Sequence, residues 1–297
     1  AVTKLANQEG ISFSELALIN GTGKSGRITK KDLEGYLSSG NRSIDESSIQ
    51  LPKESSLSFE FASNSKTDKL DNMRKRISDH MRYSLNTSAH VHIMNEVDMT
   101  DIVDFVKRED ASFRSKEGFN LTITPFIISS LAKVLNEMPE LNSSIDGDLV
   151  IQHPQINMGI AVSVDGGLMV PSINNCDEKN LLGICRDLND IVQKCRIKAI
   201  NPDDLQGSTF TLSNFGVFGA TIGTPIINQP NVGILGTGVI KKQPVVIEKN
   251  ELDIIAIRHM MMLSLGFDHR LIDGSGGALF LSKIKNILEN FNFENIL

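Results

Sequence analysis

Apolar residues recur at helical spacing in several stretches of the chain and form short continuous runs in others. Leu70, Met73 and Ile77 begin a series that continues with Met81 and Leu85, and this spacing predicts an amphipathic helix. Further helices are expected over residues 101–107, 124–138, 180–195 and 275–291, with a polar loop over 108–120. Apolar or alternating runs predict strands over residues 90–97, 156–164, 168–173, 209–212, 232–239, 245–248 and 254–265. This mixed order with long crossovers favours a mixed sheet covered by helices, an α/β (α+β) fold.

The same pattern divides the chain into three parts. Residues 1–38 contain short helical segments, and Thr29 with Asp32 opens the last of them in the manner of a capping box. Residues 39–67 are rich in serine, weakly apolar and without periodicity, which is typical of a flexible linker. Residues 68–297 hold the long periodic segments and are expected to form the large domain.

Composition and charge narrow the possible functions. The 297 residues carry a net charge of −6, which gives no general case for nucleic-acid binding. No segment reaches the roughly 18 apolar residues of a membrane helix, so no membrane association is expected. Three cysteines without metal-ligand spacing suggest reduced thiols in a cytosol-like compartment. The chain begins without Met or a signal-peptide pattern, so we expect it to be a fragment that lacks an upstream part.

A glycine-rich loop over residues 20–27 carries two cations, Lys24 and Arg27. The loop contains Lys-Ser, but it does not follow the pattern Gly-x-x-x-x-Gly-Lys-Ser/Thr, and no predicted strand precedes it. A nucleotide site is therefore disfavoured. Because a unit of this size lies near the lower limit for independent folding, a docking module is a better interpretation than a catalyst.

A polar stretch near the C-terminus places a histidine between a predicted buried strand and the last helix. His269 lies where the strand ends and a tight turn begins, and histidine is well suited to moving a proton near neutral pH. Asp273 follows four residues later and is close enough to hold the turn or the ring. The alternative is a salt-bridged turn through Asp268, Arg270 and Asp273, with His269 merely packed. Spacing alone does not separate the two interpretations.

Ser213 and Asn214 end another predicted strand as hydrogen-bond donors, although such residues are more often part of a turn. Ser213, His269 and Asp273 together would suit a hydrolase triad, but the nucleophile pattern Gly-x-Ser-x-Gly is absent. Ser213 is therefore a better hydrogen-bond donor than nucleophile. His90 and His92 alternate on a strand without a third ligand in pattern, so no metal site is predicted.

The first part of the chain resembles the peripheral subunit-binding domain of 2-oxo acid dehydrogenase acyltransferases. The shared residues are Lys4 to Ala6, Gly10 and the run over residues 21–32. The resemblance implies a small all-α domain that captures the 2-oxo acid decarboxylase or the dihydrolipoamide dehydrogenase component through basic side chains. The side chains so implied are Lys4, Lys24, Arg27 and Lys30. Thr3 and Asn7 depart from the pattern, because relatives often have Arg there.

The large domain resembles the dihydrolipoamide acyltransferase catalytic domain. Residues 268–274 match its His-x-x-x-Asp-Gly signature, which is shared more distantly with chloramphenicol acetyltransferases. Residues 96–98, 142–146, 209–214 and 224–227 are similar to further blocks of that family, in the same order. The resemblance implies a chloramphenicol acetyltransferase-like mixed-sheet domain, and it covers nearly the whole chain apart from the linker.

The implied reaction is acyl transfer from the thioester of dihydrolipoamide to the thiol of coenzyme A. In this family resemblance His269 is the base, Ser213 stabilises the oxyanion, and Asp273 mainly holds the loop against an Arg such as Arg270. The implied coenzyme A contacts are Ser213 itself with Thr122, Ser163, Asn214 and Gly238. Lipoate would be carried covalently on a lipoyl domain absent from this fragment, coenzyme A is the co-substrate, and no metal is required.

The resemblance also implies an assembly. The family builds homotrimers that assemble to a cubic 24-mer or a dodecahedral 60-mer, so His269 and Ser213 of one site would come from different chains. The apolar end over residues 292–297 would suit a contact between trimers. Ser213 with Leu212 before it is more similar to the acetyl and branched-chain types than to the succinyl type, which often has Thr at that position. The implied location is the bacterial cytoplasm or the mitochondrial matrix. A catalytically idle scaffold that only docks partner subunits is the alternative.

Overall fold

The computed structural model describes residues 2, 19, 21–23, 27–38, 65–66, 68–165, 167–249 and 252–294. The chain divides into two compact units, Ala1–Thr67 and Asp68–Leu297. Apart from residues 65 and 66, the predicted linker lies outside the described residues, and so do Lys4 and Lys24.

In the first unit, α3 (Lys30–Ser38) begins with a reciprocal capping box. The Asp32 carboxylate accepts hydrogen bonds from the backbone N–H groups of Thr29 at 2.7 Å and Thr22 at 2.9 Å. The Thr29 hydroxyl accepts a hydrogen bond from the N–H of Asp32 at 3.4 Å, which confirms the predicted capping box. Because the Thr22 hydroxyl also donates to Asp32, the glycine-rich loop is tied to the start of the helix.

The second unit is built on a seven-stranded sheet with the order β1-β11-β9-β8-β4-β7, in which β10 pairs with the outer part of β11. The strands are β1 (His90–Asp98), β4 (Met158–Ile160), β7 (Ser172–Ile173), β8 (Phe210–Asn214), β9 (Gly233–Thr237), β10 (Lys241–Lys249) and β11 (Leu252–Asp268). β8 runs parallel to β4 and β9, and the other neighbours are antiparallel, which confirms the predicted mixed sheet. Two separate antiparallel pairs are β2 (Ser143–Asp146) with β3 (Leu149–Gln152) and β5 (Val162–Val164) with β6 (Gly167–Met169).

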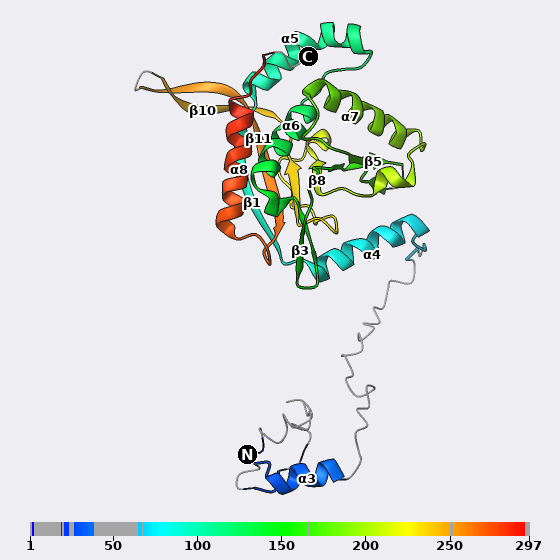
Figure 1. Ribbon diagram of the computed structural model, residues 1–297. Helices are drawn as coiled ribbons and strands as arrows, with labels where there is room; N and C mark the ends of the chain where they lie inside the picture. The colour runs from blue at the N-terminus through cyan, green and yellow to red at the C-terminus, as the bar shows by residue number, and fades with distance from the viewer. Residues whose placement is uncertain are drawn as a thin grey trace. The chain divides into compact units, whose positions relative to one another are not determined.

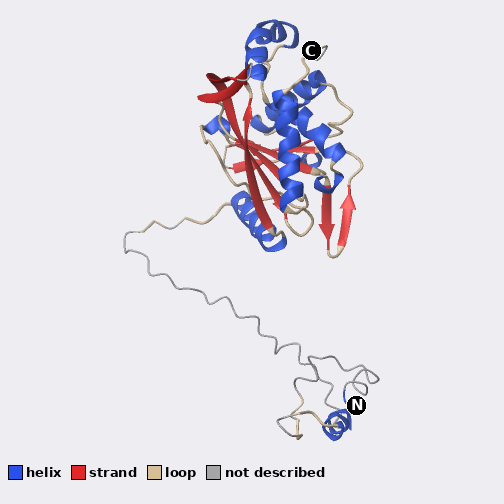
Figure 2. Cartoon of the chain, turned by 90° about the vertical axis from the view of Figure 1, so that its left-hand side faces the viewer, coloured by secondary structure: helices blue, strands red, loops and turns tan. Residues whose placement is uncertain are grey.

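Helices cover this sheet and supply much of its core (Figures 1 and 2). They are α4 (Asn72–Thr87), α5 (Thr100–Glu117), α6 (Thr124–Glu137), α7 (Leu181–Arg196) and α8 (Gly274–Glu289), with short 3-10 turns at Pro139–Leu141, Pro202–Leu205 and Gly216–Phe218. α8 packs on β1 and against α6. Phe126 of α6, Phe210 of β8 and Phe280 of α8 are fully buried, so the apolar stripes of these elements meet in one core.

β11 has two unlike parts, and this difference positions the turn that carries His269. Its C-terminal part is paired with β1 on one side and β9 on the other, and Leu265 and Phe267 are fully buried. Its N-terminal part forms a two-stranded hairpin with β10 that projects from the body of the unit (Figure 1). Ile255 and Ile257 on this hairpin are 79% and 71% exposed. The predicted buried strand before His269 is thus confirmed, and the hairpin leaves an apolar surface uncovered.

Helix α5 is longer than predicted. The prediction of a polar loop over residues 108–120 is wrong, because most of that segment is helical. The helix continues to Glu117 because Phe113 on its inner side is buried, which a polar local sequence conceals. It ends at Gly118, whose φ of 82° lies in the left-handed region that glycine adopts without strain. The Asp110 carboxylate then accepts a hydrogen bond from the N–H of Leu121 at 2.8 Å and secures the connection to α6.

Two predicted single strands are each divided in the structure. The run over 156–164 forms β4 in the main sheet and β5 in a separate pair, with Ala161 between them. The run over 168–173 forms β6 and β7, and it is interrupted at Pro171, which has no N–H to donate to a ladder. A continuous apolar run cannot reveal a change of pairing partner. The β2–β3 hairpin was not predicted, because all of β3 is exposed and the pair lacks an apolar alternation.

Candidate active site

A cavity of about 1050 Å³ in the second unit gathers most of the predicted substrate-binding residues. Its wall is formed by the segment before α6, one face of α7, β5, the end of β8 and the loop after β9. Thr122, Ser163, Ser213, Asn214 and Gly238 all line it. The rest of the lining is mainly apolar, with a small number of hydroxyl and amide groups, which is typical of a small-molecule site.

Ser213 and Asn214 reach the cavity because β8 ends there between two parallel neighbours. The pairing register places Ser213 beside Gly236 and Asn214 beside Thr237. The Asn214 side-chain oxygen accepts a hydrogen bond from the N–H of Gly216 at 3.0 Å, which turns the chain away from the sheet. The half-buried Ser213 hydroxyl has no hydrogen-bond partner within the part of the chain that the structure describes. It can therefore donate a hydrogen bond to a ligand.

Gly238 is required by the close approach of two backbone segments at the cavity wall. A Cβ atom at this position would lie 2.0 Å from the carbonyl oxygen of Thr221. The N–H of Gly238 donates to the carbonyl oxygen of Met262 at 2.9 Å. Any side chain here would push the loop after β9 away from the backbone at Ala220 and Thr221.

His269 lies at the end of β11 and is not among the residues that line the cavity. Its backbone N–H donates to the carbonyl oxygen of Ala89 at 2.8 Å, and its exposed ring stacks on Phe267 with centroids 6.0 Å apart. One chain therefore brings Ser213 together with the predicted coenzyme A contacts but does not bring His269 into the same cavity.

Asp273 is the N-cap of α8. Its carboxylate accepts hydrogen bonds from the N–H of Gly276 at 2.7 Å and from the Ser275 hydroxyl at 2.8 Å. These bonds hold the pKa of Asp273 below its usual range, and the nearby His269 acts in the same direction. The expected pairing of Asp273 with Arg270 is wrong, because a different carboxylate, Asp268, lies within reach of the guanidinium and is almost completely buried.

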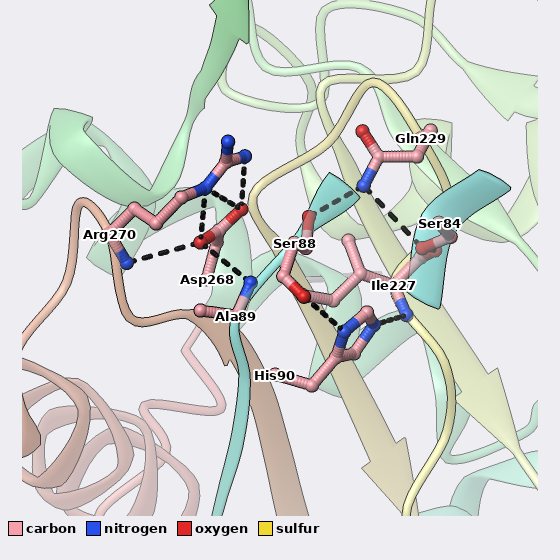
Figure 3. Close-up of polar contacts among 8 residues, drawn as sticks. All are labelled: Ser84, Ser88, Ala89, His90, Ile227, Gln229, Asp268 and Arg270. Atoms are coloured by element: carbon pink, nitrogen blue, oxygen red, sulfur yellow. Dashed lines mark hydrogen bonds and ion pairs between the residues drawn. The ribbon is translucent and has the colours of Figure 1, made fainter. Parts of the chain in front are cut away.

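The Asp268–Arg270 pair belongs to a larger polar network (Figure 3). The sequence suggested the pair but not the contacts that join it to other segments. Arg270 donates through Nε and Nη2 to the Asp268 carboxylate at 3.0 and 2.7 Å. Burial raises the pKa of Asp268, but hydrogen bonds from Arg270 and Ser88 outweigh this effect and leave the pKa below its usual value. The salt-bridged turn considered from the sequence therefore exists between Asp268 and Arg270, without Asp273.

His90 is the second centre of this network. Its Nε2 accepts a hydrogen bond from the N–H of Ile227 at 3.1 Å, so that Nδ1 carries the proton and donates to the carbonyl oxygen of Ser88 at 3.0 Å. The Ser84 hydroxyl donates to the carbonyl oxygen of Ile227, and Gln229 donates to the Ser88 hydroxyl. These bonds fix the loop at 223–230 on α4 and β1. No pattern in the sequence links these segments.

The other potentially reactive residues, the possible metal ligands and the cysteines, show no sign of a second site among the described residues. No group of three or more His, Cys, Asp or Glu within the described ranges is arranged to hold a metal ion. Cys176, Cys185 and Cys195 are free and buried, and burial raises the pKa of Cys176 to about 11 and that of Cys185 to about 12.

Among the described helices, none is long and apolar enough to span a membrane. Of the predicted partner contacts, Arg27 is exposed and Lys30 pairs with Glu34 at 3.4 Å.

Family comparisons agree with the division of the chain. Residues 62–296 match the family described as 2-oxoacid dehydrogenases acyltransferase (catalytic domain), and residues 1–34 match the e3 binding domain. The lipoamide acyltransferase component of the branched-chain alpha-keto acid dehydrogenase complex of Bacillus subtilis is 36% identical over 98% of this chain and 70% of that protein. The acetyltransferase component of the pyruvate dehydrogenase complex of Corynebacterium glutamicum is 34% identical over all of this chain and 44% of that protein. The succinyltransferase component of the 2-oxoglutarate dehydrogenase complex of Buchnera aphidicola is also 34% identical, over 94% and 68%.

Solved structures give the same result. A probable dihydrolipoamide acetyltransferase from Listeria monocytogenes matches with a TM-score of 0.75 and 37% identity, over 80% of this chain and 99% of that chain. The dihydrolipoamide acetyltransferase of Azotobacter vinelandii and a cubic core of a pyruvate dehydrogenase multienzyme complex each match with a TM-score of 0.73 and 31% identity, over 78% and 95%. The chain therefore belongs to the 2-oxoacid dehydrogenase acyltransferase family, as a dihydrolipoamide acyltransferase with an e3 binding domain ahead of its catalytic domain.

Proposed function

We propose that this acyltransferase core moves an acyl group from the thioester of dihydrolipoamide to coenzyme A at the cavity that Ser213 lines. The observation that carries the proposal is the gathering of Ser213 with Thr122, Ser163, Asn214 and Gly238 around one cavity. An apolar wall with scattered hydroxyl and amide groups suits the pantetheine arm of coenzyme A, which is itself a flexible chain with amide groups.

The chemistry requires a base and an oxyanion donor. His269 removes the proton from the coenzyme A thiol as its sulfur attacks the thioester carbonyl carbon. The carbonyl oxygen becomes an oxyanion, and the Ser213 hydroxyl stabilises it by a hydrogen bond. The tetrahedral intermediate then collapses, the bond to the lipoyl sulfur breaks, and His269 returns the proton to that sulfur. Acyl-coenzyme A and dihydrolipoamide are the products.

Asp273 has a positional role in this scheme. The solved structure of the Azotobacter vinelandii enzyme concerns the role of a serine, a histidine and an asparagine in the catalytic mechanism. In that enzyme the asparagine follows the histidine by four residues. His269 and Asp273 have the same spacing, and an asparagine cannot act as a carboxylate base. Both Asp and Asn cap helices well, which supports the capping role of Asp273 rather than proton transfer.

The complete site forms between subunits. His269 lies outside the Ser213 cavity of its own chain, which supports a site to which a second copy supplies the histidine. The exposed apolar face of the β10–β11 hairpin supports a homotrimer, because isolated two-stranded hairpins are marginally stable without further packing. Trimers would then assemble to a 24-mer or 60-mer, and the likeness to a cubic core supports the former.

The acyl group is acetyl or branched-chain rather than succinyl, a preference that rests on Ser213 with Leu212 before it. Relatives with acetyl, branched-chain and succinyl names are similarly close, so only rates separate them. The measurement is kcat/KM with acetyl-, isobutyryl- and succinyl-dihydrolipoamide. The largest value for the succinyl thioester would contradict this preference. The named relatives are bacterial, which supports a cytoplasmic location over a mitochondrial one.

The proposed reaction is tested by the change His269→Ala. We expect transfer from acyl-dihydrolipoamide to coenzyme A to fall by about 1,000-fold or more, since the base is lost. Particle size in analytical ultracentrifugation should stay unchanged, because the His269 ring is exposed and stacks only on Phe267 among the described rings. A wild-type rate in this variant would show that His269 is not the base, whereas the absence of transfer in the wild-type protein would favour the idle scaffold that only docks partner subunits.

A further inference from the structure

The His269 ring has few contacts of its own. Among the described residues it has no hydrogen-bond partner, and it stacks on the buried Phe267 while facing solvent. Where the ring points therefore depends on the backbone of the turn. A base that must meet a thiol within hydrogen-bond reach needs that backbone to be held firmly.

Asp268 and His269, which are consecutive in the chain, together bind both backbone polar groups of Ala89. The N–H of Ala89 donates to Oδ1 of Asp268 at 3.2 Å, and the carbonyl oxygen of Ala89 accepts from the N–H of His269 at 2.8 Å. Ala89 lies between α4 and β1, whereas Asp268 and His269 lie at the end of β11. The end of the His269 strand is thereby joined to a rigid junction on the neighbouring strand.

Arg270 completes this arrangement from the other side (Figure 3). Its backbone N–H donates to Oδ1 of Asp268 at 3.1 Å, and its guanidinium holds both carboxylate oxygens. The carbonyl oxygen of Asp268 accepts from the N–H groups of Leu271 and Ile272, so the backbone turns back on itself directly after His269. With a side chain only 1% exposed, Asp268 has hydrogen-bond partners for both carboxylate oxygens.

Stability alone is a weak explanation for such a pair. Buried ion pairs are often no more stabilising than apolar residues of the same size, although breaking one is costly. In some proteins such a pair instead defines one geometry, and here the residue between its two members in the sequence is His269. A bidentate Arg–carboxylate contact also has a planar geometry that permits little rotation.

We propose that Asp268 and Arg270 are positioning residues for acyl transfer, which hold the His269 backbone on Ala89 so that the ring reaches the coenzyme A thiol. This inference rests on the proposed role of His269 as the base. Neither residue touches the substrates, and both act through the placement of His269.

The first test uses Asp268→Asn, which keeps an oxygen for the Ala89 N–H but removes the charge that faces Arg270. Because small misplacements of a catalytic group are costly, kcat should fall by about 100-fold, with both KM values within about threefold of wild type. Arg270→Lys keeps the charge without the planar fork, so an intermediate loss is expected. Glu117→Gln is the matched control. It breaks another bidentate pair, with Arg186 at 2.7 and 2.8 Å, and should leave kcat unchanged.

The second test separates positioning from general destabilisation by adding Asp268→Asn to His269→Ala. If Asp268 acts only through His269, the second change should not lower the residual rate further. The same fold loss in both backgrounds would overturn the proposal, as would a wild-type kcat for Asp268→Asn beside an inactive His269→Ala. A fully active His269→Ala would instead overturn the proposed function. Should Asp268→Asn not fold, the cycle is measured with Arg270→Lys, whose side chain is 41% exposed.

Discussion

At the scale of single residues, the two proposed catalytic side chains differ in how they are held. Ser213 lies next to the end of a short strand between two parallel neighbours, and the sheet itself places its hydroxyl, which has no partner among the described residues. His269 follows the long β11 and depends on a turn that Asp268 and Arg270 secure. The Ser213 donor is held by its strand and the His269 base by its turn, so both can be rigid although they do not contact each other within one chain.

Removal of the Ser213 hydroxyl tests its role as an oxyanion donor. Ser213→Ala should lower kcat by about 100-fold to 1,000-fold, which corresponds to about 3–4 kcal/mol in the barrier. The measurement is steady-state acyl transfer with both substrates varied. Ser163→Ala removes another hydroxyl from the same cavity and should raise the KM for coenzyme A with little change in kcat. Equal effects of the two variants on kcat would contradict the assignment.

At the scale of elements, the start of α8 decides the conformation just after the His269 turn. Asp273 satisfies an N–H group in the first turn of the helix, where an acidic side chain also meets the positive end of the helix dipole. The cap therefore anchors the turn at its far end, while Asp268 anchors it at its near end.

Replacement of Asp273 distinguishes a cap from a proton carrier. Asp273→Asn should keep most of the activity because its side-chain oxygen still caps α8, whereas Asp273→Ala should lower both activity and melting temperature. The folded pKa of Asp273 is lowered, so its stabilising contribution is present above the unfolded pKa of about 3.9 and is lost as pH falls through the folded value. Thermal melts below pH 4 should therefore show a smaller pH dependence in Asp273→Asn. An inactive Asp273→Asn that folds normally would favour a proton-transfer role.

At the scale of the whole molecule, the proposed catalytic residues do not meet within a single chain. Its cavity holds Ser213 but not His269, and its β10–β11 hairpin exposes Val246, Ile255 and Ile257 on one face. The proposed assembly would explain both facts, if its contacts cover the hairpin and bring His269 to a neighbouring cavity. Activity and assembly should then be lost together.

A charge on the hairpin tests this link. Ile255→Lys should shift the sedimentation of the protein to smaller species and abolish acyl transfer, because a lysine that is buried in an interface is strongly unfavourable. Leu149→Lys places the same charge on an apolar residue of the β2–β3 hairpin, which is 68% exposed, and serves as the matched control. A small but fully active Ile255→Lys species would contradict a site shared between subunits.

The first unit offers a separate prediction. Arg27→Ala should weaken binding of the dihydrolipoamide dehydrogenase component in calorimetry, and the difference from wild type should be larger at low salt, where charges are less screened. Lys31→Ala, on the same unit, removes an exposed cation that is not among the predicted contacts. Unchanged affinity for Arg27→Ala would remove Arg27 from the docking surface.

The sequence by itself determined the local elements, because spacing alone reports which side of a helix or strand is buried. It was sufficient for the amphipathic α4 and α7, the mixed sheet, the capping box at Thr29 and the buried strand before His269. Its resemblance to a family also supplied five of the residues that line the cavity. Only the tertiary structure decided the partner of Arg270 and the division of residues 156–164 between two strands. These features depend on which segments meet across the fold, and local patterns contain no information about contacts between residues far apart in the chain.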